Sequence, residues 1–273
     1  DDRARAEAAC LTAFRAGDAG AACAEARSAG SPAAAFLAAA TGAAPEGLDA
    51  AAEAGLAPAL TVRALPVLRA ADTSPTARAG ALTDLRSAAH TGYAPAQTWL
   101  AVALLAGEDG AGREAEAANL LARAARQGSA DAQFLLAGLH RTGRGVVADR
   151  QRMRDLYLEA AQRGHAGAAY NLSADLFLRG DRTRAETWLR RSASGGFGPA
   201  LAALARRSGA EGAVEAAAIY HGLAAAFSAG GVAASEKAAS VRATAPLDAS
   251  ARQRVSERIA SFEIAIRAAR EDR

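Results

Sequence analysis

The chain has 273 residues, of which 51% are hydrophobic and only 5% aromatic, and its formal net charge is +3. The positive charge rests on arginine, with Lys237 as the only lysine, and no run of basic residues is interleaved with stacking aromatic side chains, so we expect no nucleic-acid partner. The longest uncharged apolar run, residues 33–44, is shorter than the roughly 18 residues that a membrane span needs, so we expect no transmembrane segment.

The first thirty residues predict a helical hairpin that caps the N-terminal end of the fold. Helical patterns cover residues 4–16 and 19–29, joined by the tight connection AGDAG. In such a hairpin Cys10 and Cys23 lie at similar distances from the turn, so a disulfide between them is feasible and would indicate an oxidising compartment such as a periplasm. The alternative is that both cysteines are small buried core residues that stay reduced.

A recurrent phrase begins in the next segment, residues 31–91. It consists of two small residues, two variable residues, Gly, three variable residues and Ala. Gly92, Gly128 and Gly164 of this phrase are 36 residues apart, a period typical of stacked helical repeats. Residues 31–91 keep the phrase in shorter units, so we interpret them as divergent helical repeats. The five copies cover residues 51–59, 88–96, 124–132, 160–168 and, with Ser in place of the first Ala, 192–200.

The copy over residues 130–164 shows most clearly what one unit is. Two segments with apolar residues at helical spacing, SADAQFLLAGLHRTG and DRQRMRDLYLEAAQRG, flank the loop GRGVVAD. Asp149 stands at an N-cap position, and Gly143 and Gly164 stand where a left-handed residue ends a helix. Small residues such as Ala132 and Ala160 would let neighbouring helices approach closely. The phrase is therefore interpreted as the seam where one helical pair ends and the next one stacks onto it.

The same segment resembles the Sel-one-like repeat, a relative of the tetratricopeptide repeat. The residues that carry the resemblance are Ala132, Phe134, Leu136, Ala137, the loop Gly143-Arg144-Gly145-Val146, Asp149 and the closing Ala160-Ala161…Gly164. With the 36-residue period, this resemblance implies an all-α fold: an α-solenoid (superhelix) of stacked antiparallel helical hairpins. We assign Sel-one-like or tetratricopeptide-like repeats to residues 92–231.

Residues 232–273 resemble the capping end of exported bacterial members of this family. Residues 213–231 resemble a last second helix, a short helix follows over 233–242, and Asp248 begins a polar helix that runs to about Arg270. This final helix carries an apolar stripe and an otherwise charged surface, as expected of a unit that shields the end of a solenoid. The stripe consists of Val255, Ile259, Phe262 and Ile266.

The sequence contains no catalytic constellation, so we predict that the chain is not an enzyme and needs no metal or cofactor. The four histidines are not at the i, i+4 spacing of a helical metal pair, and no nucleophile elbow follows a strand. An accessory lysin or hydrolase would need a pair of acidic residues in a cleft, and the sequence shows no such pair. The histidines are His90, His140, His165 and His221.

A solenoid without chemistry offers an extended docking surface lined by its first helices, so we predict a non-catalytic protein-protein interaction scaffold or adaptor. When the units are aligned, Trp99, Leu135 and Asn171 are equivalent. Because the residue at this position changes from Trp to Asn between units, the shared core does not require a Trp there, and Trp99 is the first contact candidate. The alternative is that Trp99 fills a local gap. The concave-face candidates are Gln97, Trp99, Gln133, Asn171 and Asp175.

A second hypothesis uses the arginines near the helical turns, which form a candidate rim for an anionic partner such as a polysaccharide. The alternative is that these arginines lie on solvated helix faces and bind no partner. The rim candidates are Arg141, Arg144, Arg179, Arg182 and Arg184. A start at Asp1 fits a chain from which a signal peptide was removed, so we expect a periplasmic or secreted protein, with the cytoplasm as fallback. Resemblance to exported bacterial solenoids implies a partner protein in signalling, the envelope or exopolysaccharide export.

Overall fold

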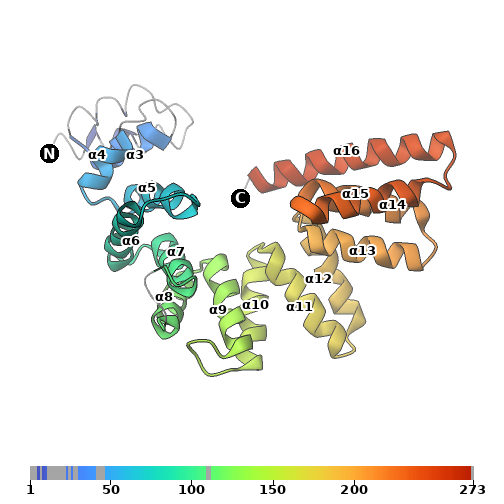
Figure 1. The fold of residues 1–273 in the computed structure, drawn as a ribbon, viewed down its shortest axis with the longest axis horizontal. Coiled ribbons are helices and arrows are strands. Elements are labelled where there is room, and N and C mark those ends of the chain that lie inside the picture. The colour runs from blue at the N-terminus through green and yellow to red at the C-terminus, as the bar shows by residue number, and fades with distance from the viewer. Residues whose placement is uncertain are drawn as a thin grey trace. The chain divides into compact units, whose positions relative to one another are not determined.

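The computed structural model describes residues 5–6, 8–10, 23, 26, 30–40, 47–108 and 112–271, and within them every regular element is a helix (Figure 1). The chain divides into two compact units, residues 1–148 and 149–273. The helices of the first unit are α3 (Pro32–Ala40), α4 (Gly47–Glu53), α5 (Ala57–Arg69), α6 (Pro75–His90), α7 (Ala94–Leu105), α8 (Glu114–Arg126) and α9 (Ala130–Thr142). Those of the second unit are α10 (Arg150–Gln162), α11 (Ala166–Leu178), α12 (Arg182–Ser194), α13 (Gly198–Ala210), α14 (Val214–Phe227), α15 (Gly230–Thr244) and α16 (Ala249–Glu271).

Each helix packs mainly against the next helix in the sequence. In the first unit this holds from α3 to α9, and in the second unit from α10 to α15. Short connections between sequential helices make them antiparallel neighbours, which is the arrangement of a helical-repeat stack. The predicted fold class, an α-solenoid of stacked helical hairpins, is confirmed. The division after Ala148 falls inside the block 92–231, between the loop and the second helix of the unit that best matches the Sel-one-like repeat.

The recurrent phrase forms the end of one helix and the start of the next. At the end of α10, the amide of Gly164 donates to the carbonyl of Ala161 (3.1 Å), and the amide of His165 donates to that of Ala160 (3.0 Å). Gly164 has φ +90°, so the two bonds form a Schellman motif with glycine in its left-handed position. The two small residues of the phrase thus supply the carbonyls that accept the hydrogen bonds of the helix C-cap, and the glycine forms its turn.

The small side chains at both ends of the phrase allow the helices to nest. Because an alanine side chain has only one carbon, neighbouring helix axes can approach to the short end of the usual packing distances. A larger side chain at such a joint would have no free volume to occupy. These positions are 0% exposed in all five copies, at Ala51, Ala88, Ala124, Ala160 and Ser192 and at Ala59, Ala96, Ala132, Ala168 and Ala200.

The loop after α9 folds back on the start of α8. Arg144 donates to the carbonyl of Leu105 (3.4 Å) and lies 3.5 Å from a carboxylate oxygen of Glu114. Gly145 has φ +68°, and a Cβ atom there would lie 2.2 Å from the carbonyl oxygen of Glu114. The second glycine of the family's Gly-x-Gly loop is therefore required by backbone conformation and by a backbone-to-backbone contact. Asp149 caps α10 as predicted, accepting from the amides of Gln151 and Arg152 at 2.8 and 2.9 Å.

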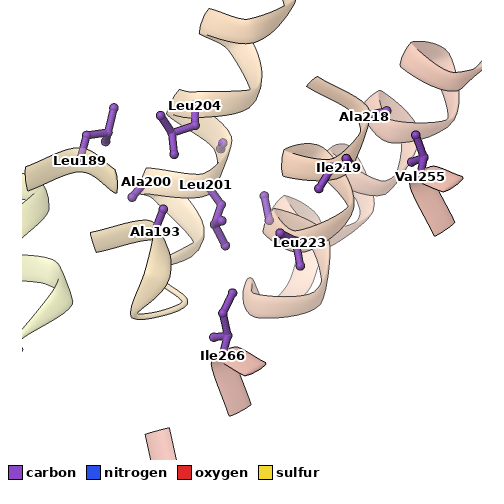
Figure 2. Packing of buried hydrophobic residues seen from close by; sticks show 12 residues of the cluster. Leu189, Ala193, Ala200, Leu201, Leu204, Ala218, Ile219, Leu223, Val255 and Ile266 are labelled. Carbon is purple, nitrogen blue, oxygen red and sulfur yellow. The ribbon is translucent and has the colours of Figure 1, made fainter. Parts of the chain in front are cut away.

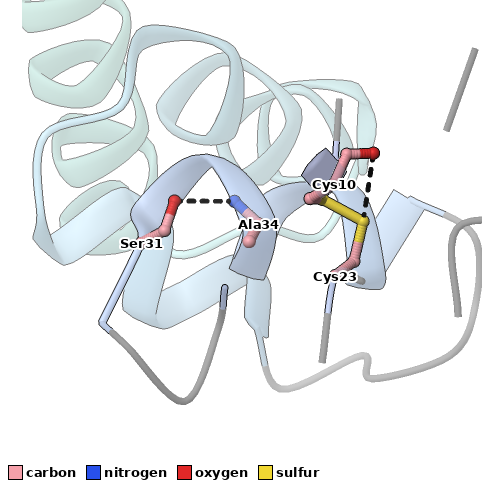
Figure 3. The surroundings of a disulfide bond; sticks show 4 residues. All are labelled: Cys10, Cys23, Ser31 and Ala34. Atoms are coloured by element: carbon pink, nitrogen blue, oxygen red, sulfur yellow. Dashed lines mark hydrogen bonds between the residues drawn. A yellow bond between two sulfur atoms is a disulfide. The ribbon is translucent and has the colours of Figure 1, made fainter. Parts of the chain in front are cut away.

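The N-terminal segment contains the predicted disulfide, between Cys10 and Cys23 (Figure 3). Both cysteines are buried, in a small cluster with Ala26 and Ala34. Ser31 accepts a hydrogen bond from the amide of Ala34 at 3.2 Å and so begins α3 (Figure 3). The alternative of two reduced core cysteines is not what the structure shows. Most of the predicted hairpin over residues 1–30 lies outside the described residues.

The second unit ends with the long helix α16, which packs against α14. Asp248 begins it as predicted, accepting from the amide of Ala251 at 2.7 Å. At its other end Arg270 donates to the carbonyls of Gly195 (3.1 Å) and Gly196 (2.7 Å), and these carbonyls end α12. The predicted apolar stripe is buried only in part. Val255 and Ile266 join the core of the unit (Figure 2), Ile259 is half-buried, and Phe262 is 42% exposed.

Candidate binding surface

Two sets of equivalent repeat positions have matching burial, in agreement with the alignment of the units. Gln97, Gln133 and Ala169 are buried, whereas Trp99, Leu135 and Asn171 are half-buried. These residues lie on α7, α9 and α11, the first helices of their pairs. Trp99, Leu135 and Asn171 therefore each keep part of their surface open, while the side chain changes from one repeat to the next. We call this set of equivalent sequence positions the variable column.

The predicted contact residues Gln97 and Gln133 are buried and form hydrogen bonds within the fold. The side-chain amide of Gln97 donates to the carbonyl of Ala89 (3.3 Å), and its oxygen accepts from Gln127 (3.0 Å). Gln133 donates to the carbonyl of Ala125 (3.5 Å), one repeat further on. Both glutamines thus bind the seam of the preceding unit, and their burial makes them inaccessible to a partner in this structure. This corrects their interpretation as concave-face contacts.

Trp99 lies beneath an arginine of another helix. The guanidinium carbon of Arg69, at the end of α5, is 4.8 Å from the centroid of the indole ring. Arg69 is exposed and Trp99 is half-buried, so the pair combines a cation–π contact with open aromatic surface. Tryptophan and arginine are the residue types that most often dominate binding energy in protein interfaces. The chain's other tryptophan, Trp188 on α12, is stacked in a similar way under Arg191 at 5.3 Å.

Asn171 and Asp175 lie one turn apart on α11 of the second unit. Both are half-buried. Arg179 lies 4.0 Å from a carboxylate oxygen of Asp175. They form a short polar stretch that includes the α11 member of the variable column, in a unit that has no tryptophan on its first helices among the described residues.

The predicted arginine rim is largely neutralised by carboxylates. Arg144 pairs with Glu114, Arg179 with Asp175, and Arg184 with Asp181. Hydrogen bonds from the Arg184 amide and then from its guanidinium lower the pKa of Asp181 below its ordinary value. The remaining two are exposed: Arg141 at the end of α9 and Arg182 at the start of α12.

The second unit also contains an ion network that the sequence analysis missed. Glu186 pairs with Arg190 (2.7 Å) and Arg207 (3.0 Å), and Arg207 pairs in turn with Glu211 (2.8 Å). Hydrogen bonds from Arg190 and then Arg207 lower the pKa of Glu186. The network joins α12 to α13. The i, i+4 spacing of Glu186 and Arg190, and of Arg207 and Glu211, was a signal that could have indicated it.

Three of the four histidines have structural contacts. His165 begins α11, its Nδ1 accepting from the amide of Ala168 at 3.0 Å. His140 Nδ1 lies 3.2 Å from the carbonyl of Val147, and His221 Nδ1 lies 2.6 Å from a carboxylate oxygen of Glu236. Within the described ranges, no three His, Cys, Asp or Glu side chains gather where they could hold a metal ion.

None of the described helices is by itself long and apolar enough to cross a membrane. The pair α4 and α5 passes such a test together by length and composition, and it is bent by 115° at its break.

Comparisons with known proteins agree with this fold. No family model matches the sequence, and no curated protein matches it. Among solved structures, a Sel1 repeat protein from Oxalobacter formigenes is similar, with a TM-score of 0.63 and 22% identity over 73% of this chain and 86% of that one. A protective antigen present in uropathogenic Escherichia coli strains, which displays an SLR fold, has a TM-score of 0.55 and 17% identity over 97% of this chain and 70% of that one. The resemblance to Sel-one-like repeats is thus confirmed at the level of the fold.

Proposed function

We propose that this chain is a non-catalytic scaffold or adaptor that binds a partner protein along the exposed side of its first helices. The observation that carries the proposal is the variable column. Its positions keep one place in the fold and one degree of burial, yet they hold Trp99, Leu135 and Asn171. Side chains that the common packing does not dictate, at equivalent positions of successive repeats, suit recognition of another protein.

Trp99 is the strongest contact candidate in the first unit, and Asn171 with Asp175 in the second. A half-buried tryptophan under an arginine supplies a large apolar area together with a charge over the face of its ring. The polar pair on α11 offers hydrogen-bonding groups in the second unit. Each unit thus has its own contact candidate, an aromatic hot spot in the first and a polar pair in the second.

The disulfide supports an exported location. Disulfides persist in oxidising compartments and are rare in the cytosol, where thiol systems keep cysteines reduced. Cys10 and Cys23 are paired, and no free cysteine occurs among the residues described. We therefore place the protein in a periplasm or outside the cell, where its partner would be an envelope, signalling or polymer-export component.

Direct binding of an anionic polysaccharide is the weaker alternative, because three of the five rim arginines already pair with carboxylates. Paired arginines leave little net positive charge for a polyanion. Affinity for an acidic polysaccharide that fell steeply with salt would favour this alternative.

The test is site-specific photo-crosslinking in the producing cells. A photoreactive phenylalanine analogue is placed at position 99, on the variable column, or at position 188, the matched tryptophan on a second helix. We expect one dominant protein adduct when the analogue is at position 99 and no such adduct when it is at position 188. Mass spectrometry then identifies the partner. Equal adduct patterns at the two positions, or no protein adduct at position 99, would count against the proposal.

A further inference from the structure

The second unit contains an apolar groove of about 650 Å³ between α12 and α16, and the variable column does not contribute to it. Its floor is formed by Leu201 and Leu204 of α13 and by Ile219 and Leu223 of α14. These side chains also belong to the hydrophobic core of the unit, so here the core reaches the surface. The volume lies within the range of roughly 300–1,000 Å³ typical of ligand pockets.

The groove exists because α16 covers the core incompletely. Ile266 faces Leu201 and Leu223 across the space between the helices (Figure 2). Phe262, one turn earlier on α16, lines the groove and is still 42% exposed. The terminal helix therefore adds an apolar wall and does not close the space.

The charges around the groove leave one arginine in excess. Arg190 and Glu215 both line it, and each is paired outside it, Arg190 with Glu186 (2.7 Å) and Glu215 with Arg254 (2.9 Å). Among the described residues, no carboxylate pairs with Arg258, whose guanidinium carbon lies 5.5 Å from the centroid of the Phe262 ring. A ligand that complements this groove is apolar along its length and carries a carboxylate beside Arg258.

The shape of the groove favours a helical ligand. The lining residues of α16 extend from Arg258 to Ala269, a length of roughly 16 Å at the rise of an α-helix, which equals about three helical turns. An amphipathic helix of that length presents apolar side chains at i, i+3 or i+4 and i+7 to a groove bounded by two helices. We propose that the groove between α12 and α16 binds an amphipathic helix of a partner protein, with an acidic residue of that helix against Arg258. This is a second binding surface, independent of Trp99.

The proposal is tested by selecting peptides of about twelve residues from a displayed random library on the purified full chain. We expect the enriched peptides to carry an apolar helical stripe and at least one Asp or Glu. Binding of the synthesised peptides is then measured by fluorescence anisotropy. Ala265→Trp, which fills the groove from an exposed position, should weaken binding by about tenfold or more, because it removes apolar contact worth 1.4 kcal/mol or more. The matched control is Ala268→Trp, an exposed alanine on the same helix that does not line the groove.

Charge reversal separates the acidic contact from apolar contact alone. Arg258→Glu should weaken the acidic peptides by about tenfold, and peptides in which Lys replaces the acidic residue should regain affinity for this variant. No enrichment, or peptides that bind all variants equally, would overturn the proposal. A dimer in sedimentation velocity that Ala265→Trp dissociates would also overturn it, because the occupant would then be a second copy of the chain. We expect crosslinks from position 99 to be unaffected by these variants, because Trp99 does not line the groove, so failure here is distinct from failure of the proposed function.

Discussion

Replacing Gly145 by alanine adds a Cβ atom where the backbone of the loop after α9 contacts the backbone of α8. Its Cβ would lie 2.2 Å from the carbonyl oxygen and 2.3 Å from the carbonyl carbon of Glu114, and 2.7 Å from the amide nitrogen of Ala115. None of these atoms can rotate away, because all three belong to the backbone at the start of α8. The substitution must therefore displace either the loop after α9 or the N-terminus of α8.

The magnitude has two parts. An L-residue at φ +68° costs about 1–2 kcal/mol because the left-handed conformation crowds its Cβ. Forcing a carbon into a filled contact typically costs about 1–3 kcal/mol more. Gly128 separates the two, because it has φ +87° and a Cβ there would meet nothing within 4 Å. We expect Gly128→Ala to lose only the first part, about 1–2 kcal/mol.

The assay is urea denaturation followed by fluorescence of Trp99 in a Trp188→Phe background, so that only the first unit is observed. The free energy of unfolding should fall by about 2–5 kcal/mol for Gly145→Ala, which is the sum of the two parts, and by clearly less for Gly128→Ala. Equal losses in the two variants would refute the reasoning, because they would mean that the contact with Glu114 adds nothing to the cost of the left-handed conformation.

Three further predictions follow from particular contacts. Intact mass should rise by two hydrogens on reduction of the unfolded chain, and Cys10→Ser with Cys23→Ser should lower the stability of the first unit by about 3 kcal/mol, the usual effect of opening a loop of this length; unchanged mass would contradict the disulfide. The pKa of Glu186 is below its ordinary 4.5 in the folded state, so the stability that the ionised carboxylate contributes is present above pH 4.5 and lost as pH falls through the folded-state pKa. Glu186→Gln should therefore be less stable than wild type at pH 7, and the difference should vanish in acid. A constant stability difference across pH in thermal unfolding would contradict this. Asp149→Ala should cost about 1 kcal/mol, whereas Asp149→Ser should retain most of the cap, as measured by urea denaturation; equal losses would mean that the two cap hydrogen bonds carry no weight.

Much of the fold was predictable because the seams are local. The stop at Gly164, the cap at Asp149 and the buried face of α10 each depend on residues within a few turns of one another, and the sequence pattern contains all of them. The burial of Gln97 and Gln133 was not predictable in this way. From the sequence alone, a polar residue on a first helix resembles a partner-contact residue. In the structure its amide donates to a carbonyl at the seam of the preceding repeat, and the sequence around the glutamine does not show that acceptor.

The groove was hidden for a similar reason. The apolar stripe on α16 predicted a buried face, but how much of that face is covered depends on where α16 lies against α14. Ile266 contacts the turn at Gly196, where a Cβ atom would lie 2.6 Å from Ile266 Cγ2, whereas Phe262 stays 42% exposed. Contacts between residues about seventy positions apart set this outcome, and no periodicity in a single chain encodes them.

The central claim is that small side chains at the seams let helical pairs nest, and one pair of variants on α11 tests it most directly. Ala168 is fully buried at a seam, and Ala174 on the same helix is exposed. Unfolding of the second unit is followed through Trp188 in a Trp99→Phe background. The account predicts that Ala168→Leu lowers the free energy of unfolding by about 1–3 kcal/mol and that Ala174→Leu changes it by no more than about 0.5 kcal/mol. Equal effects of the two substitutions, or a seam that accepts leucine without loss, would contradict it.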